Sequence, residues 1–329
     1  MATTYTNTLA TPDQVGKIQD VSNAINNLDK DETPFITAIG RGAKAKNVYT
    51  EFETRNLPTY DEDSDISQGQ KAAPTASVQP TLQGNYQQLF EDTASVTTTA
   101  QAQAQYNIKE KLADQIRLKT TAMKIAINKR AQGNYASQEP ASGNDNVGKF
   151  AGALAWMTGD NVARGATGAD GGFNGTTKIV SAYTPGTARP LTEDIFLDTI
   201  KEIARGRKMT NYDAFMNADN RSFVSRNFTG IAGLTQNVDN PRVDIGLQGS
   251  VGFMKTDYGI VTIHYDHTTP DDAIPIIQKK LWKLRDMEPW KTQTLGTTGL
   301  SKEKQVWTST TLEATNQAGS GAVVDIDVS

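Results

Sequence analysis

The sequence has 329 residues, with 33 Lys and Arg against 37 Asp and Glu and a formal net charge of −4. This length allows one large domain or two modest ones with an ample core. The absence of cysteine excludes disulfides, thiolate zinc sites and cysteine nucleophiles. The slightly acidic balance argues against a protein dedicated to reading nucleic-acid sequence. No apolar run is long enough for a membrane-spanning helix.

The N-terminal segment is polar, and it lacks the basic start and apolar core of a signal peptide. We therefore expect the protein to be made and kept in the cytoplasm. Five apolar residues in the first thirty have helical spacing, namely Val15, Ile18, Val21, Ile25 and Leu28. A helix with so few apolar residues would be marginal alone, so we expect it to pack on something else, for example another subunit.

A projecting hairpin is predicted next. Thr33-Pro34 turns the chain, and residues 47–55 and 86–99 have the composition of strands. The residues between them, 57–85, are polar and hold several Pro and Gly without any periodic apolar pattern. Two strands joined by such an excursion cannot bury themselves, so a partner surface is implied.

A long helix is predicted at about 101–132, with Gly133-Asn134 as its stop. Its buried stripe is expected to comprise Ile108, Leu112, Ile116, Thr120, Met123 and Ile127. Residues 134–190 are rich in Gly, Asn, Ser and Ala, and we expect mostly loop there.

Helices and strands mix irregularly in the remaining chain. Helices are predicted at 192–207 and 218–228, and strands at 212–217, 260–266 and 305–314. The absence of a regular βαβ rhythm indicates an α+β fold.

Charge is unevenly distributed in two segments. Residues 51–65 hold six acids against Arg55, and residues 109–130 hold seven bases against two acids. The two segments are either separate solvated surfaces or a complementary pair that meets between subunits. The second interpretation nominates as contacts the acids Asp61, Glu62, Asp63 and Asp65 and the bases Lys109, Lys111, Arg117, Lys119 and Lys124.

Two patterns suggest ligand binding but are incomplete. Residues 143–149 resemble a phosphate-cradling loop, but Phe150 replaces the magnesium-binding hydroxyl residue. Asp61, Asp63 and Asp65 have the spacing that opens a calcium loop, but Ile66 stands at the required glycine. A solvated acidic loop is the simpler interpretation of the second pattern.

Two further groups are better explained without chemistry. His264 and His267 are the only histidines, and their spacing on a strand end places them poorly for shared metal ligation. Trp282 and Trp290 lie among Lys and Arg, where they either stack on nucleic acid or anchor the segment on the core or another subunit. The second role is favoured. No catalytic residue, metal ligand or cofactor site is nominated, and we do not expect an enzyme.

The C-terminal quarter carries a family resemblance. The β-rich stretch 256–267, the apolar AIPIIQ at 273–278, the Trp- and Lys-rich stretch 279–296 and the β-rich tail 304–329 follow one another. This order resembles the C-terminal part of tailed-phage major capsid proteins with the Hong Kong 97 capsid fold. The DETPF element at 31–35 and the order of arm, hairpin and long helix are similar to the same family.

The resemblance implies an arm, an extended hairpin (E-loop), a spine helix, a peripheral domain and an inserted axial domain. The expected bounds are 1–45 for the arm, 46–99 for the hairpin, 100–160 for the spine helix and first part of the peripheral domain, 161–270 for the axial domain, and 271–329 for the second part of the peripheral domain. The strand at 305–314 would pair with segments next to the hairpin.

The implied function is self-assembly into pentamers and hexamers of an icosahedral virion capsid that encloses double-stranded DNA without sequence specificity. Expected partners are a scaffolding protein, a portal and decoration proteins, with assembly in the host cytoplasm and no membrane. A separate scaffolding protein is expected because no long charged segment precedes the arm. Alternatives are an encapsulin-like nanocompartment shell and, farther away, a metal-dependent enzyme or carbohydrate-binding module.

Overall fold

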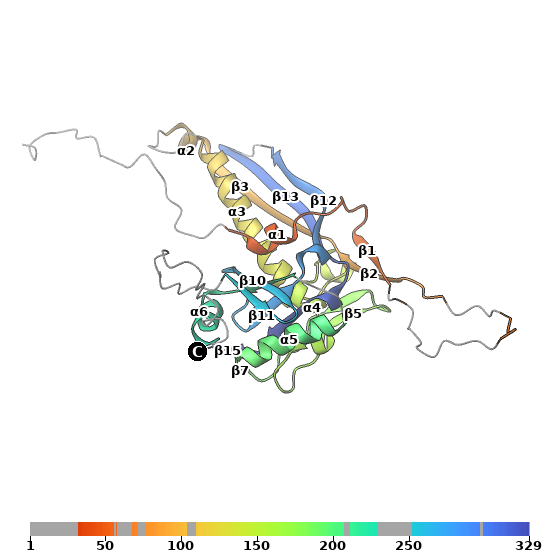
Figure 1. Ribbon diagram of the computed structural model, residues 1–329. Helices are drawn as coiled ribbons and strands as arrows, with labels where there is room; N and C mark the ends of the chain where they lie inside the picture. Colours follow the sequence, from red (N-terminus) through yellow and green to blue (C-terminus); the bar gives the residue numbers. More distant parts are fainter. Residues whose placement is uncertain are drawn as a thin grey trace, which may run out of the picture.

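The computed structural model of the chain describes residues 32–55, 57, 68–71, 77–103, 110–206, 211–228, 252–296 and 299–328. A long helix and a long three-stranded sheet form one part of the molecule, and a six-stranded sheet with its helices forms the other (Figure 1). Helices and strands are mixed, as the sequence predicts for an α+β fold. Among the described residues, no helix is both long and apolar enough to cross a membrane. The predicted helix within the first thirty residues lies outside the described part.

The arm ends in a short helix, α1 (Pro34–Ile39), which is fixed by Phe35 and Ile39 in the core. Pro34 at the first helical turn needs no hydrogen-bond partner there. The ring of Phe35 meets that of Phe215 edge-on, with ring centroids 5.1 Å apart. The arm is therefore attached to the six-stranded sheet just before the hairpin begins.

The hairpin is present, but its second strand differs from the predicted one. Strand β1 (Tyr49–Thr54) pairs antiparallel with β2 (Thr81–Tyr86), so that of the predicted returning strand 86–99 only Tyr86 pairs with β1. Weak strand formers in β2, among them Gly84, hid it from sequence analysis. Gly84 lies under the ring of Tyr49, so a larger residue there would collide with that ring.

The residues predicted as the returning strand instead form β3 (Gln88–Thr97), which belongs to another sheet. That sheet has the order β12-β13-β3, with β12 (Trp282–Thr294) and β13 (Ser301–Ala314). Strand β13 is antiparallel to both neighbours. The predicted pairing of the 305–314 strand with segments next to the hairpin is thus confirmed.

The predicted long helix is divided in two. The first part is α2 (Thr98–Ala102), and the second is α3 (Lys111–Gln132), which has 22 residues and a length of about 33 Å. The ammonium group of Lys111 donates hydrogen bonds to the carbonyl oxygens of Ala100 and Gln103. Lys111 thereby caps the end of α2, and α3 starts ten residues later than predicted.

The described part of the predicted helix stripe faces inward. Leu112, Met123 and Ile127 are buried, and Ile116 and Thr120 are half-buried. Helix α3 packs chiefly against β3 and also contacts β13 and α1. It therefore forms the layer that covers the three-stranded sheet (Figure 1).

The six-stranded sheet has the order β4-β14-β11-β8-β10-β9. Its strands are β4 (Val162–Ala163), β8 (Asn211–Met216), β9 (Phe253–Thr256), β10 (Gly259–Tyr265), β11 (Ala273–Ile277) and β14 (Gly321–Val324). One face packs against α5 (Glu193–Gly206) and α6 (Ala218–Asn227). The sheet contains strands from before and after residue 270, the predicted boundary between the axial domain and the second part of the peripheral domain.

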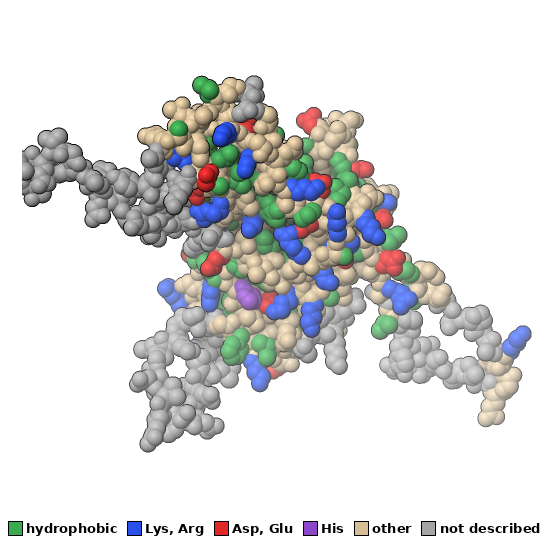
Figure 2. Space-filling view, turned by 90° about the horizontal axis from the view of Figure 1, so that it is seen from above, with side chains coloured by type: hydrophobic (Ala, Val, Ile, Leu, Met, Phe, Trp, Pro, Cys, Tyr) green, Lys and Arg blue, Asp and Glu red, His purple; other side chains and the backbone are tan. Residues whose placement is uncertain are grey.

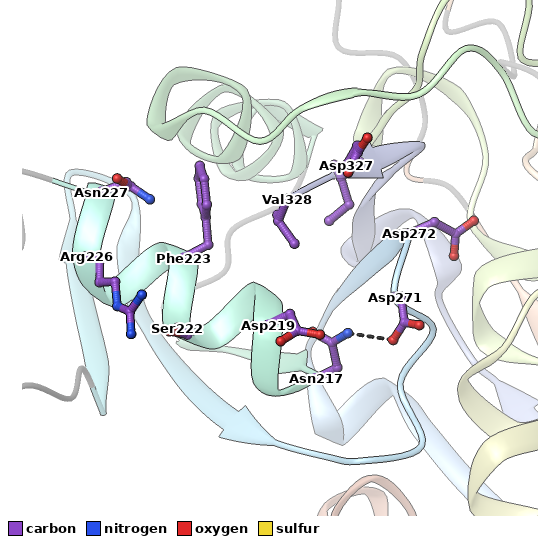
Figure 3. A pocket seen from close by; sticks show the side chains of 11 residues that line it. Asn217, Asp219, Ser222, Phe223, Arg226, Asn227, Asp271, Asp272, Asp327 and Val328 are labelled. Atoms are coloured by element: carbon purple, nitrogen blue, oxygen red, sulfur yellow. Dashed lines mark hydrogen bonds between the residues drawn. The ribbon is translucent and has the colours of Figure 1, made fainter.

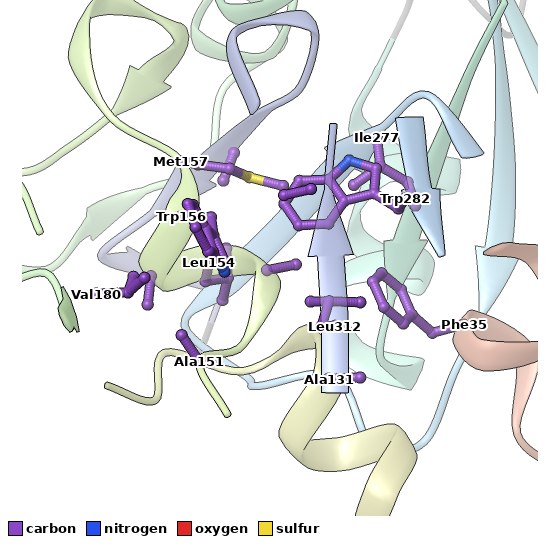
Figure 4. Close-up of a cluster of buried hydrophobic side chains, with 14 of the residues drawn as sticks. Phe35, Ala131, Ala151, Leu154, Trp156, Met157, Val180, Ile277, Trp282 and Leu312 are labelled. Atoms are coloured by element: carbon purple, nitrogen blue, oxygen red, sulfur yellow. The ribbon is translucent and has the colours of Figure 1, made fainter. Parts of the chain in front are cut away.

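The segment 134–190 contains more structure than the sequence predicts. It holds α4 (Ala153–Trp156) and short strands β5 (Gly172–Asn174), β6 (Ile179–Ser181) and β7 (Arg189–Pro190), the last of which pairs with β15 (Ile326–Asp327). Residues 150–157 are almost completely buried and contribute Phe150, Leu154 and Trp156 to the main core (Figure 4). Composition concealed this run because it is short and lies between Gly-rich stretches.

Candidate functional site

The phosphate-loop resemblance at 143–149 is not supported by the local geometry. Ser142–Asn144 form one turn of 3-10 helix, and Asp145 and Asn146 adopt positive φ. Lys149 exchanges backbone hydrogen bonds with Gln138, so the segment leads into a β-bridge. A phosphate-cradling loop requires a following helix whose N-terminal amides face the anion, and none begins here.

One of the two histidines lies beside a buried carboxylate. Among the residues that the structure describes, no group of three His, Asp or Glu is placed to hold a metal ion. His264 lies on β10, where its Nε2 is 2.8 Å from Oδ1 of the buried Asp213. Its ring stacks on Phe215 with centroids 5.0 Å apart. Lys279 also contacts Asp213, with 3.4 Å between Nζ and Oδ1.

These neighbours control the charge of Asp213. Burial by itself would raise the pKa of this carboxyl group, but the hydrogen bond from His264 and the charge of Lys279 hold the pKa below its ordinary value of 3.8. The carboxylate is therefore kept ionised inside the protein by two bases. This arrangement stabilises the end of the sheet, and it offers no nucleophile beside the histidine.

A pocket of about 490 Å³ lies between α6 and the C-terminal strand (Figure 3). Its acidic lining comprises Asp219, Asp271, Asp272 and Asp327. Asn217 donates a hydrogen bond of 2.6 Å to Asp271 and accepts one from the backbone N–H of Asn220, so it is the N-cap of α6. No histidine lines the pocket beside Ser222.

The anchoring role favoured for Trp282 is confirmed. Its side chain is completely buried, and its Nε1 donates a hydrogen bond of 2.8 Å to Oγ of Ser320. Trp290 is partly buried and packs against the same core. Both indole rings therefore have structural partners within the subunit.

The predicted acidic and basic contacts are only partly described. Asp61, Glu62, Asp63, Asp65 and Lys109 lie outside the described residues. Lys111 caps α2, Arg117 pairs with Asp114 at 3.2 Å, and Lys119 pairs with Asp92 at 2.6 Å. Lys124 is exposed, and within the described part of the chain it forms no ion pair. The structure thus does not place the acids beside this helix or anywhere else.

A second basic surface is formed by two segments that are far apart in the sequence. Gly42 donates its backbone N–H to the carbonyl of Leu284, and Ala45 donates to that of Asp286, so residues 41–46 run beside the start of β12. We define the hairpin-root surface as Arg41, Lys44, Lys46, Lys279, Lys280, Lys283 and Arg285. Figure 2 shows Lys and Arg side chains gathered across the middle of a face of the molecule.

Ion pairs occupy only some of the bases of the hairpin-root surface. Arg41 pairs with Asp286, Arg285 with Glu313, and Lys279 with Asp213. The remaining four are exposed and form no ion pair with any described residue, namely Lys44, Lys46, Lys280 and Lys283. Sequence analysis missed this surface because more than 230 residues separate its two basic segments along the chain.

Large apolar side chains are exposed on the hairpin and on one sheet edge. Leu82 of β2 is 55% exposed, and Leu57, just beyond β1, is 90% exposed. At the edge strand β9 and its neighbour β10, Phe253, Tyr258 and Ile260 are also exposed. Apolar groups gathered at an unpaired strand edge are typical of surfaces that contact another chain.

Comparisons with known proteins give one family and one fold. A family model described as SU10 major capsid protein matches residues 1–327. No curated protein matches the sequence. Among solved structures, the chain is similar to one from Mycobacterium phage Che8, with 12% identity and a TM-score of 0.61 over 94% of this chain and 97% of that chain.

Two other solved structures define the range of similarity. The capsid asymmetric unit of cyanophage A-1(L) has 12% identity and a TM-score of 0.62, covering 98% of this chain and 99% of that chain. The holo-SrpI encapsulin complex from Synechococcus elongatus has 12% identity and a TM-score of 0.55, covering 95% and 97%. These matches confirm the predicted Hong Kong 97-like fold.

Proposed function

The chain belongs to the SU10 major capsid protein family, and from this premise we propose that its copies form the pentamers and hexamers of an icosahedral phage head around double-stranded DNA. Its role as a major capsid protein is structural. The finer proposal rests on one observation, the projecting hairpin β1–β2, whose outer end exposes apolar side chains.

The two ends of this hairpin have opposite surroundings. At the inner end, Tyr86 is buried and its ring lies 4.8 Å from that of Tyr49. At the outer end, Leu82 is exposed opposite Glu53. A two-stranded sheet is barely stable in water when nothing covers it. A second copy that covers the outer end supplies the missing burial, and repetition of such heterologous contacts closes a ring.

The proposed division of the chain follows the predicted bounds. Residues 1–45 serve as the arm, 46–99 as the extended hairpin, and 100–160 with 271–329 as the peripheral domain, into which the axial domain of 161–270 is inserted. The two apolar cores follow these bounds only in part, because the core that contains Trp282 also includes Val180, and the core that contains Phe196 also includes Ile274. The six-stranded sheet contains strands from before and after residue 270, so it joins the proposed axial and peripheral domains.

We also propose the expected partners and location. The shell forms in the host cytoplasm with a scaffolding protein and a portal, becomes part of the virion, and can carry decoration proteins. Its acidic segment 61–65 binds a basic surface of a second copy; the sequence nominates the bases of the long helix for this contact. Many such weak contacts together stabilise a closed shell.

A nanocompartment shell is the second candidate, supported by the encapsulin match. Its TM-score of 0.55 is below the values of 0.61 and 0.62 for the phage structures, and the family model is that of a phage capsid protein. The phage head is therefore favoured.

Electron microscopy and light scattering of the purified protein test the proposal. Closed shells, or rings of five and six, are expected, alone or after addition of a scaffolding protein from the same phage. As a control, Leu82→Asp should leave a folded subunit that assembles poorly. A wild-type chain that stays monomeric with scaffold and crowding agents would overturn the proposal.

A further inference from the structure

The four lysines of the hairpin-root surface that have no ion pair with a described residue are Lys44, Lys46, Lys280 and Lys283; the charge of Lys44 also acts on the exposed carboxylate of Glu288. Residues 40–47 contain three bases and no acid, and residues 278–286 contain four bases and one acid. Lys44, Lys46, Lys280 and Lys283 are all exposed. Four solvent-exposed ammonium groups on neighbouring segments repel one another, so an acidic partner that enters between them gains from all four.

The surface is rigid as well as charged. The Arg285 guanidinium donates a hydrogen bond of 3.0 Å from Nε to the carbonyl of Ala43, which fixes the loop against β12. Gly42 allows this approach, because a side chain there would press on the aliphatic parts of Lys283 and Arg285. A docking surface that is ordered before binding loses less conformational entropy on association.

The chain itself contains a segment of matching chemistry. Residues 51–65 hold six acids against one base, and the densest part is Asp61, Glu62, Asp63 and Asp65. We propose that this acidic segment of one copy docks on the hairpin-root surface of a second copy, in preference to the bases of α3. This inference rests on the proposed self-assembly and names the surface that receives the hairpin.

Reach and direction favour a second copy over the same chain. Strand β1 starts just after Lys46 and leads away from the hairpin-root surface (Figure 1). Asp61 and Asp65 follow the end of β1 at Thr54 by seven and eleven residues. At about 3.3 Å per residue, an extended chain carries these acids up to ~23–36 Å beyond Thr54. To reach the hairpin-root surface of its own copy, the acidic segment would have to turn back and run the full length of β1.

The bases of α3 are the weaker partner because three of them are already engaged. Lys111, Arg117 and Lys119 all have partners within the subunit. Transfer of these bases to an acid of another copy would exchange one contact for another with little net gain. The four exposed lysines of the hairpin-root surface form no ion pair with a described residue.

Packaged DNA is the less suitable occupant of this surface. Asp286 and Glu313 lie within it as partners of Arg41 and Arg285. These carboxylates interrupt the positive surface that a phosphate backbone would need along its length. A short acidic segment requires only the exposed lysines.

Charge reversal at both ends tests the inference. One variant changes the loop (Asp61→Lys, Glu62→Lys, Asp63→Lys), and another changes the surface (Lys44→Glu, Lys280→Glu, Lys283→Glu). Each alone should reduce subunit association on the order of tenfold, more strongly at low ionic strength. A matched helix control (Arg117→Glu, Lys124→Glu, Lys129→Glu) should associate as the wild type does. Circular dichroism and thermal melting verify that each subunit is folded.

Mixing the loop and surface variants distinguishes contacts between copies from contacts within one. Each loop then meets an oppositely charged surface only on the other kind of subunit. Native mass spectrometry should show restored association with mixed pairs in excess. If association were restored only in a chain that carries both the loop and the surface changes, the contact would lie within one copy and the inference would be overturned. Restoration of the loop variant's association by the helix changes would also overturn it.

Two further results would overturn this inference while leaving self-assembly intact. One is normal association of the surface variant. The other is normal association with weaker binding of double-stranded DNA, which would assign the surface to DNA. A wild type that fails to assemble would instead contradict the proposed function itself.

Discussion

Asn128 of α3 donates a hydrogen bond of 2.7 Å from Nδ2 to Oδ2 of Asp266, which follows β10. Its Oδ1 accepts the backbone N–H of Ile36 in α1 at 3.0 Å. One completely buried side chain thus links the arm, the long helix and the six-stranded sheet. Gln132, one turn further along α3, also donates to Asp266. The relative placement of the three elements therefore depends on a polar contact in the core.

We predict that Asn128→Leu lowers the free energy of unfolding by about 3 kcal/mol, because the buried carboxylate of Asp266 and the N–H of Ile36 each lose a partner. Urea unfolding of the unassembled subunit measures this change. Lys124→Ala on the exposed side of the same helix serves as the control and should change stability by less than ~0.5 kcal/mol. Equal effects of the two substitutions would contradict the role of the buried network.

We predict that Gly152→Ala destabilises the subunit by at least ~3 kcal/mol. A methyl group at this position would lie closer than 3.0 Å to the carbonyl oxygens of Gly133 and Arg130 at the end of α3. Because these are backbone atoms, the helix end must move. Gly143→Ala is the matched control, since nothing lies within 4 Å of its added methyl group. Soluble yield and the melting temperature should separate the two variants, and a fully stable Gly152→Ala subunit would disprove the close approach.

The acid stability of the subunit should depend on Asp213. The pKa of this carboxyl group is lowered in the folded state, so its stabilisation is complete above the ordinary value of 3.8 and is lost as the pH falls through the lower folded value. Asp213→Asn should therefore be less stable than the wild type near neutral pH, and the difference should shrink as the pH falls below 3.8. Melting temperatures across the acid range measure this effect. The melting temperature of the control Asp257→Asn, at an exposed position, should follow that of the wild type at every pH. A stability difference for Asp213→Asn that does not change with pH would contradict the role of the ionised Asp213.

A double-mutant cycle should detect the hydrogen bond between Trp282 and Ser320. Ser320→Ala leaves the buried indole N–H without its partner, so we expect a loss of about 1–2 kcal/mol. In the background of Trp282→Phe, which has no indole N–H, the same substitution should cost clearly less. Equal costs in both backgrounds, measured by denaturant unfolding, would show that this bond contributes nothing.

The elements that sequence analysis predicted well are those with a strong local pattern. The amphipathic helix α5 and the alternating strand β10 follow from the spacing of their apolar residues, and Phe196, Val261 and Ile263 are buried as expected. The errors concern partners. Residues 88–97 are a strand, as predicted, but β13 pairs with them because it offers a longer partner than β1 does.

The same distinction applies to the candidate contact surfaces. The acidic segment 61–65 and the basic character of 109–130 are visible in the sequence because their charges are neighbours along the chain. That Lys111, Arg117 and Lys119 already have partners is visible only in the fold.

The sequence by itself determined the family, the α+β class and the order of arm, hairpin and long helix, because these depend on local patterns and on the chain order of motifs. Only the tertiary structure decided which strands pair, how Asn128 joins three elements, and where exposed lysines gather. Gly42 and Lys283 are neighbours because the backbone of residues 41–46 bonds to β12. Such contacts depend on packing between segments hundreds of residues apart, and no local pattern records them.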